Sequence, residues 1–330
     1  MKNEKNKVLQ IVQNISKHVD AKKWECLFPE CNNSSINSHL LQVNGILNNI
    51  VENGHLYEIG ANDIFSFEEK GITTFNKKGI NQAISDHLFC NTHDTQIFKD
   101  IESASIDLFK YKTQLLFSYR SLCGELRKKM KNVDFFERLI NVKAVPIENF
   151  YDLESLKKEI IGNKIGVEHM TIYKTNMELE IFSNSIPKFK FYTYQFPEMK
   201  ICVSAIFSPI HMTDIILSKQ LYPENPLKNV FINVIPHESK LTIIIGYHVD
   251  FADDWIRNYV ALWGEIEGVE LQKQLTNLLT TKVETWSISP SLFEKITESS
   301  KQKLKKYWQE NANNLLADQI VNFNLFEGTT

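Results

Sequence analysis

Two short-spaced pairs of cysteine and histidine residues constrain this chain more than any other feature of its sequence. Cys26 and Cys31 form the first pair, and Cys90 and His93 form the second. Structural zinc prefers tetrahedral coordination by thiolate and imidazole, and the ligands usually come as two pairs that the fold brings together. The spacing therefore predicts that these four side chains bind one zinc ion.

The sequence around each pair suits this role. The first pair lies in the segment WECLFPECNNSSINSH, which is rich in the proline, asparagine and serine of irregular structure. The second pair directly precedes apolar residues at helical spacing, beginning with Ile97 and Ile101. Backbone N–H groups at the start of a helix also favour an anionic thiolate. One ligand pair on a turn and another at a helix start are typical of a treble-clef zinc module.

The other cysteines and the absence of long apolar runs indicate the cellular compartment in which we expect the protein. Cys123 and Cys202 lie in apolar surroundings, and we expect both to be small buried hydrophobic residues. Residues 1–20 lack the continuous apolar core of a secretory signal. No apolar run approaches the roughly 20 residues needed to span a membrane. The sequence predicts a cytoplasmic protein with no membrane partner.

Apolar periodicity predicts several elements in the first half of the chain. Residues 4–19 have helical spacing, and residues 40–54 are expected to form a short helix that ends at a C-cap glycine. A third helical stretch begins near Ile97 and keeps one apolar face as far as residue 132. Pro146 marks a break, because proline disfavours helix in the residue before it. Short strands are predicted at 55–60, 63–69 and 71–79.

The second half of the chain combines strands and helices. Segments rich in β-branched or aromatic residues predict strands at 188–194, 200–207, 229–235 and 241–249. The last two flank a loop of hairpin length, so we expect them to pair antiparallel. Helices are predicted at 152–162, 255–265, 271–279 and 292–321.

The fold class that follows is α+β. We expect an N-terminal treble-clef-like zinc module with helices, followed by a C-terminal antiparallel sheet with packed helices. The predicted domains are a zinc-binding module at 1–100, a helical connector at 101–146 and a mixed α+β domain at 147–330.

His39 is a fifth candidate for the metal site, in the sequence Ser38-His39-Leu40. A tetrahedral site has no room for it once the two pairs are in place. His39 could replace one of the four ligands, could be a structural histidine bonded to a loop, or could act as a catalytic base.

The order of these residues over 26–94 resembles the HNH endonuclease family and its treble-clef relatives. The resemblance implies that His39 is the general base that activates water. It also implies that Asp94, directly after His93, holds a catalytic Mg²⁺ or Mn²⁺ ion for phosphodiester hydrolysis. His93 stands where the family has a cysteine. Ser85 and His87 occupy the neighbourhood where the family's asparagine is expected, and the nearest asparagine, Asn81, lies too far upstream. The same segments resemble bacterial proteins that join an N-terminal zinc module to a helical or mixed tail.

Three functions remain open on this sequence. In the first, the zinc is structural and the α+β domain recognises a ligand, a nucleic acid or another protein; HNH-like modules recur in restriction and phage-defence proteins, which suggests a defence role. In the second, the zinc module is a divergent HNH-like nuclease. In the third, the α+β half is the enzyme and the zinc module is an adaptor. The basic runs RKKMK and KQKLKKYW are either phosphate contacts or solvated helix faces. A net charge of −3 argues against a generally basic nucleic-acid-coating protein.

Overall fold

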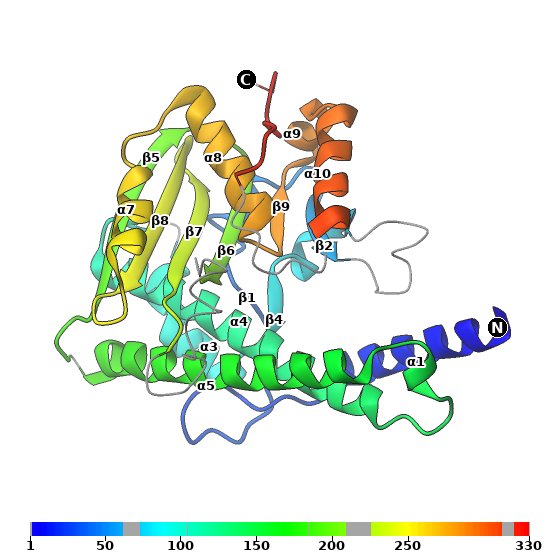
Figure 1. Cartoon of the computed structure of the whole chain (residues 1–330). Coiled ribbons are helices and arrows are strands. Elements are labelled where there is room, and N and C mark those ends of the chain that lie inside the picture. The colour runs from blue at the N-terminus through cyan, green and yellow to red at the C-terminus, as the bar shows by residue number, and fades with distance from the viewer. Residues whose placement is uncertain are drawn as a thin grey trace.

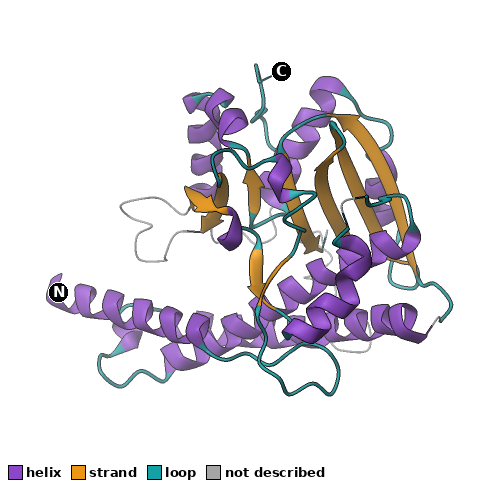
Figure 2. Ribbon diagram, turned by 180° about the vertical axis from the view of Figure 1, so that it is seen from behind, coloured by secondary structure: helices purple, strands orange, loops and turns teal. Residues whose placement is uncertain are grey.

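The structure is a computed structural model that describes residues 2–61, 73–103, 105–183, 185–208, 226–311 and 320–329. An antiparallel sheet lies between two groups of helices (Figure 1). One group contains the long helices α4 (Tyr111–Ile140) and α5 (Leu153–Ser183), which pack against one another along their length. The other group comes from the C-terminal third of the chain (Figure 1), and Figure 2 shows the helices and the sheet from behind. The predicted α+β class, with helices packed on an antiparallel sheet, is confirmed.

The main sheet has seven strands within the described residues, in the order β3-β2-β9-β6-β7-β8-β5. All the pairings between neighbouring strands are antiparallel. The β7–β8 hairpin turns through Glu238 and Ser239, whose positive φ angles of 49° and 58° suit a tight turn between twisted strands. This confirms the hairpin predicted from the sequence. The strands are β2 His55–Ala61, β3 Thr73–Gly79, β5 Phe189–Pro197, β6 Ile201–Phe207, β7 Val230–His237, β8 Lys240–His248 and β9 Trp286–Ile288.

Both faces of the central strands are buried. Phe231 and Ile244 belong to the core that α4 and α5 cover, whereas Ile232 and Ile245 belong to the core under the C-terminal helices. Burial on both sides explains why these strands are almost continuously apolar instead of alternating. The C-terminal helices are α7 Asp254–Leu262, α8 Gly268–Thr281, α9 Pro290–Lys295 and α10 Glu298–Asn311.

A smaller, two-stranded sheet carries the N-terminal ligand segments. Strand β1 (Asn37–His39) pairs antiparallel with β4 (Ser85–His87), and helix α3 (Asn91–Phe98) follows. Between β1 and β4 the chain leaves this sheet and adds β2 and β3 to the edge of the main sheet, where β2 pairs with β9. Helix α1 (Lys2–Ala21) confirms the first predicted helix and packs on α4. The proposed domain boundaries at residues 100 and 146 stay predictions; the main sheet takes strands from both sides of them.

The helix predicted at 40–54 is wrong. This segment contains only a 3₁₀ turn, η1 (Leu47–Asn49), between buried Ile46 and Ile50. Glycine and several asparagines give the segment low helix propensity. Tertiary burial of the apolar residues therefore decides its conformation.

The continuous helix predicted from Ile97 is also wrong. Helix α3 ends at Phe98 and continues only as the 3₁₀ turn η3 (Lys99–Ile101), and α4 begins at Tyr111. The Asp107 carboxylate accepts a hydrogen bond from the Phe109 N–H (3.0 Å), which is an Asx turn that competes with helix.

Two other helix ends differ from the prediction. Helix α5 does not stop at Gly162 but continues through it, because a glycine there costs only about 1 kcal/mol and the helix packs along α4. The helix predicted at 292–321 is broken at Ile296, which has extended backbone and separates α9 from α10. The predicted strand 63–69 and residues 312–319 lie outside the described residues. Across the described ranges, no helix combines the length and the apolar character needed to cross a membrane.

Candidate metal centre

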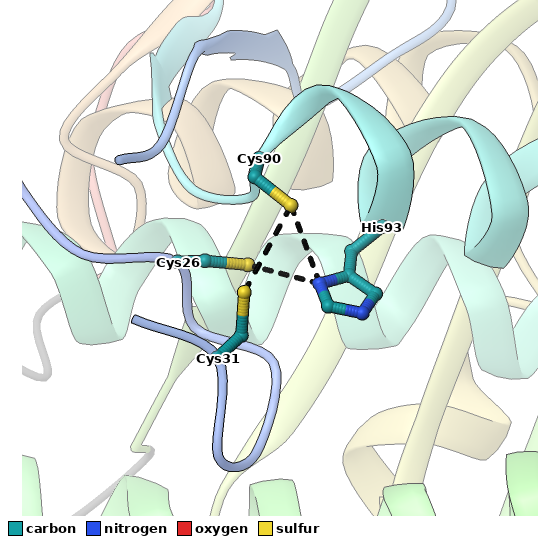
Figure 3. A group of neighbouring side chains, drawn as sticks. All are labelled: Cys26, Cys31, Cys90 and His93. Carbon is teal, nitrogen blue, oxygen red and sulfur yellow. Dashed lines mark hydrogen bonds between the residues drawn. The ribbon is translucent and has the colours of Figure 1, made fainter. Parts of the chain in front are cut away.

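The structure brings Cys26, Cys31, Cys90 and His93 together, with all four ligand atoms within 4.8 Å of one another (Figure 3). The His93 Nδ1 lies 3.5 Å from the Cys26 sulfur and 3.3 Å from the Cys90 sulfur. The Cys31 and Cys90 sulfurs are 4.0 Å apart. Tetrahedral zinc bonds of about 2.3 Å to sulfur and 2.0–2.1 Å to nitrogen require separations of about 3.8 Å between sulfurs and about 3.5 Å between sulfur and nitrogen. The cluster is therefore compatible with one tetrahedral metal ion.

The first ligand pair lies on a closed turn. The Cys26 N–H donates to the Asn33 carbonyl (2.8 Å), and the Cys31 N–H donates to the Phe28 carbonyl (3.2 Å). Glu30 adopts a φ of 59°, which reverses the chain just before the second sulfur. The Leu27 N–H donates to the carbonyl of Leu88 (2.9 Å), so this turn is also tied to the segment that carries the second pair.

The second pair lies at the start of α3. Cys90 is the N-cap residue and has extended backbone, so that its sulfur and the His93 ring project from the first helical turn. Burial opposes ionisation of Cys90. Hydrogen bonds from the His93 N–H, from the Cys26 and Cys31 thiols and from the Thr92 N–H together outweigh burial and hold the pKa of Cys90 below its usual value. Burial instead raises the pKa of Cys26 to about 11. A cation at the centre would favour the thiolate form of both.

Aromatic packing holds the His93 ring. The ring stacks on Phe28 with 3.9 Å between centroids, and Phe28 in turn meets the edge of Phe182 of α5 at 5.5 Å. This packing holds the imidazole plane so that Nδ1 faces the sulfurs, as Figure 3 shows. Orientation by such outer neighbours is a general requirement of metal-binding histidines.

Arg127 is a structural residue of the site that sequence reasoning missed. Its Nε donates to the His87 carbonyl (2.6 Å) and its Nη2 to the Glu25 carbonyl, and the guanidinium lies over the Trp24 ring. The two acceptors lie just before the two ligand pairs, so one buried side chain of α4 holds both segments. Arg127 belongs to the basic run RKKMK, where nothing in the local sequence distinguishes it from the neighbouring lysines.

The structure places the two predicted catalytic residues outside the four-ligand cluster. The His39 Nε2 is 3.1 Å from the Ile80 carbonyl oxygen. The Asp94 carboxylate lies 3.6 Å from the buried guanidinium of Arg120, which also binds Glu102 at 2.6 Å. His39 is therefore not one of the clustered ligands, and Asp94 already has a cationic partner. Their catalytic roles stay predictions.

Comparison of the chain with protein-family models, curated proteins and solved structures found no match in any of the three. The resemblance to HNH nucleases consequently stays a resemblance over residues 26–94. A function for the chain has to be argued from the chemistry of its own sites.

Proposed function

We propose that this protein binds one structural zinc ion through Cys26, Cys31, Cys90 and His93, and that the ion organises a treble-clef-like module. The observation that carries the proposal is the convergence of three sulfurs and one imidazole nitrogen from two distant segments to within 4.8 Å of one another. The turn, the β1–β4 sheet and α3 are the three parts of that module.

A structural role suits the site because four protein ligands fill the tetrahedral positions. Catalytic zinc sites keep a position for water or substrate, which this ligand set does not supply. The ion would join the turn to the start of α3 and would contribute folding free energy directly. Arg127 would serve the same purpose from α4, since it binds a carbonyl beside each ligand segment.

We assign recognition of a ligand or partner to the α+β part. Its sheet is covered on both faces, so the outer surfaces of its helices and the sheet edges are available for contact. The basic runs carry acidic partners within the chain: Lys131 binds Asp86, Lys301 binds Glu298 and Lys306 binds Glu310. This pairing favours a protein or small-molecule partner over nucleic acid, and a defence role rests only on the HNH resemblance.

A second candidate is metal-dependent phosphodiester hydrolysis with His39 as general base. One observation favours it: the contact between the His39 Nε2 and the Ile80 carbonyl fixes the tautomer with the proton on Nε2. The lone pair then lies on Nδ1, which could accept a proton from water. The ion pair of Asp94 with Arg120 opposes the proposed Mg²⁺ or Mn²⁺ ligand, because the carboxylate would have to leave its partner.

The proposal is tested by elemental analysis of protein purified without chelator. We expect about one zinc ion per chain in the wild type and in His39→Ala, and loss of zinc in Cys90→Ser. Cys123→Ser is the matched control, because this buried cysteine of α4 lies outside the cluster and should keep its zinc. Zinc-free wild-type protein, or full zinc in Cys90→Ser, would overturn the proposal. Cleavage of DNA or RNA with Mg²⁺ or Mn²⁺, abolished in His39→Ala, would support the second candidate.

A further inference from the structure

The two faces of the small β1–β4 sheet carry different side chains. The strands pair Asn37 with His87, Ser38 with Asp86 and His39 with Ser85. Residues directly opposite one another in an antiparallel pair share a face, and successive residues alternate between faces. One face therefore has Ser38 and Asp86, and the other has both histidines with the asparagine and the serine.

The first of these faces is turned toward α4. The Asp86 carboxylate binds Lys131 of α4 at 2.6 Å, and Ser38 is only 2% exposed. The histidine face is consequently the outer one. The His87 side chain is 38% exposed, so this face is open to solutes.

His39 and His87 are diagonal neighbours on the outer face, because His39 pairs with the residue two positions before His87. Such neighbours lie roughly 7–8 Å apart between Cα atoms, which is within reach of aromatic side chains. The two rings can therefore approach a common atom between them.

The His39 ring also has the kind of neighbour that orients a metal-binding histidine. The His39 Nε2 donates to the Ile80 carbonyl, which leaves the Nδ1 lone pair for a ligand. Within the described residues, the His87 ring has no hydrogen bond of this kind: its Nδ1 lies 3.9 Å from the Asp86 carboxylate, beyond hydrogen-bond distance, so the partly exposed ring can turn either nitrogen toward a ligand. A backbone carbonyl is one of the usual outer partners of ligating histidines.

We propose that this outer face is a second metal site, in which the His39 Nδ1 and a ring nitrogen of His87 bind a divalent first-row transition ion. Two imidazoles favour Zn²⁺, Ni²⁺ or Cu²⁺ over the harder Mg²⁺. Asn37 and Ser85 place an amide and a hydroxyl on the same face, and water completes the coordination. The site shares no ligand with the Cys₃His cluster. It rests on the proposed function only because the structural zinc holds β1 and β4 in place, and it makes His39 a ligand instead of a free base.

The test is calorimetric titration of Zn²⁺ into protein that already holds its structural zinc. We expect a second, weaker equivalent in the wild type. Loss of an outer partner alone typically weakens metal binding by roughly 10–100-fold, so His39→Ala and His87→Ala should each weaken the second equivalent by at least about tenfold. His55→Ala is the matched control, since this exposed histidine of β2 lies outside the proposed site and should titrate as the wild type does.

Elemental analysis of each variant keeps the two sites distinguishable. Retention of the structural zinc in His39→Ala and His87→Ala shows that the module is folded, so that any change belongs to the second site. A shift of the His39 and His87 ring nitrogens in NMR spectra on adding the second equivalent would support the assignment independently of any variant. Absence of a second equivalent, or wild-type titration by His87→Ala, would overturn the inference whatever the state of the first site.

Discussion

We expect the buried His248, at the end of β8, to make the free energy of unfolding fall as the pH is lowered. The ring is 1% exposed, stacks on Phe251 with 4.2 Å between centroids, and meets the edge of Phe189 at 4.9 Å. Its Nδ1 accepts a hydrogen bond from the Asp250 main-chain N–H (3.3 Å), so protonation would break this bond and bury a charge. Burial lowers the pKa of His248 to about 4, although the Asp250 carboxylate opposes the shift; Lys188 adds to it.

The sign of the effect follows from the order of the two pKa values. An unfolded histidine has a pKa of about 6.5, so the unfolded chain takes up a proton first as the pH falls. The contribution of neutral His248 is complete above about pH 6.5 and is lost progressively toward pH 4, at up to about 1.4 kcal/mol per pH unit. Between pH 7 and pH 5 the two values give a loss of about 2 kcal/mol in the free energy of unfolding.

Urea unfolding of the wild type and of His248→Gln at pH 7 and pH 5 measures this loss. Glutamine keeps a buried acceptor for the Asp250 N–H but does not titrate, so the variant should lose about 2 kcal/mol less than the wild type between the two pH values. Excess zinc is present throughout, and effects common to both proteins cancel, including those of the buried His169. His18→Gln, at an exposed histidine of α1, should behave as the wild type. Equal pH dependence in the wild type and His248→Gln would refute the reasoning.

Three further predictions address packing and the metal. Arg127→Met leaves two carbonyls beside the ligand segments unpaired, so it should lower the free energy of unfolding by about 3 kcal/mol in the same urea titration. Arg138→Met, which removes an exposed ion pair, should lower it by less than about 1 kcal/mol. Similar losses in the two variants would contradict the role of Arg127 in joining the two ligand segments. Gly246→Ala would place a methyl group 2.2 Å from a ring carbon of Phe191 and should lower the melting temperature sharply. Gly162→Ala meets open space within α5 and should raise the free energy of unfolding by about 1 kcal/mol. A Gly246→Ala protein as stable as the wild type would contradict the packing described. Removal of the proposed zinc ion by a chelator should speed hydrogen exchange in the Cys26–Cys31 turn and α3 while the β7–β8 hairpin stays protected. A uniform change in exchange would show that the ion does not act locally.

The features that could be predicted from the sequence are those encoded over short distances. Four ligands in two short-spaced pairs are sufficient to predict the cluster, because few other roles bring three thiols and an imidazole together in a chain of this kind. The β7–β8 hairpin is also local, since two β-branched segments flank a turn at Glu238 and Ser239.

The features that escaped prediction depend on distant partners. Strand β2 pairs Ile59 with Trp286, and no local pattern relates positions so far apart. Arg127 acts through backbone carbonyls, which every residue has, so its role leaves no signature in the sequence. Gly162 weakens the helix by about 1 kcal/mol, and packing of α5 against α4, which the local sequence does not reveal, offsets this cost.

The pairing of β2 with β9 has a consequence for how the chain is made. On the ribosome, the β2–β3 ribbon emerges long before Trp286 and Ile288, so one edge of β2 stays unpaired for most of translation because β9 has not yet been made. An open strand edge can template pairing with another chain, and a two-stranded ribbon is marginally stable in water. Early zinc capture by the segments on either side of this ribbon would close its two ends into a compact loop while the nascent chain grows. Cells short of zinc would then be expected to accumulate this protein as aggregates of incomplete or newly released chains.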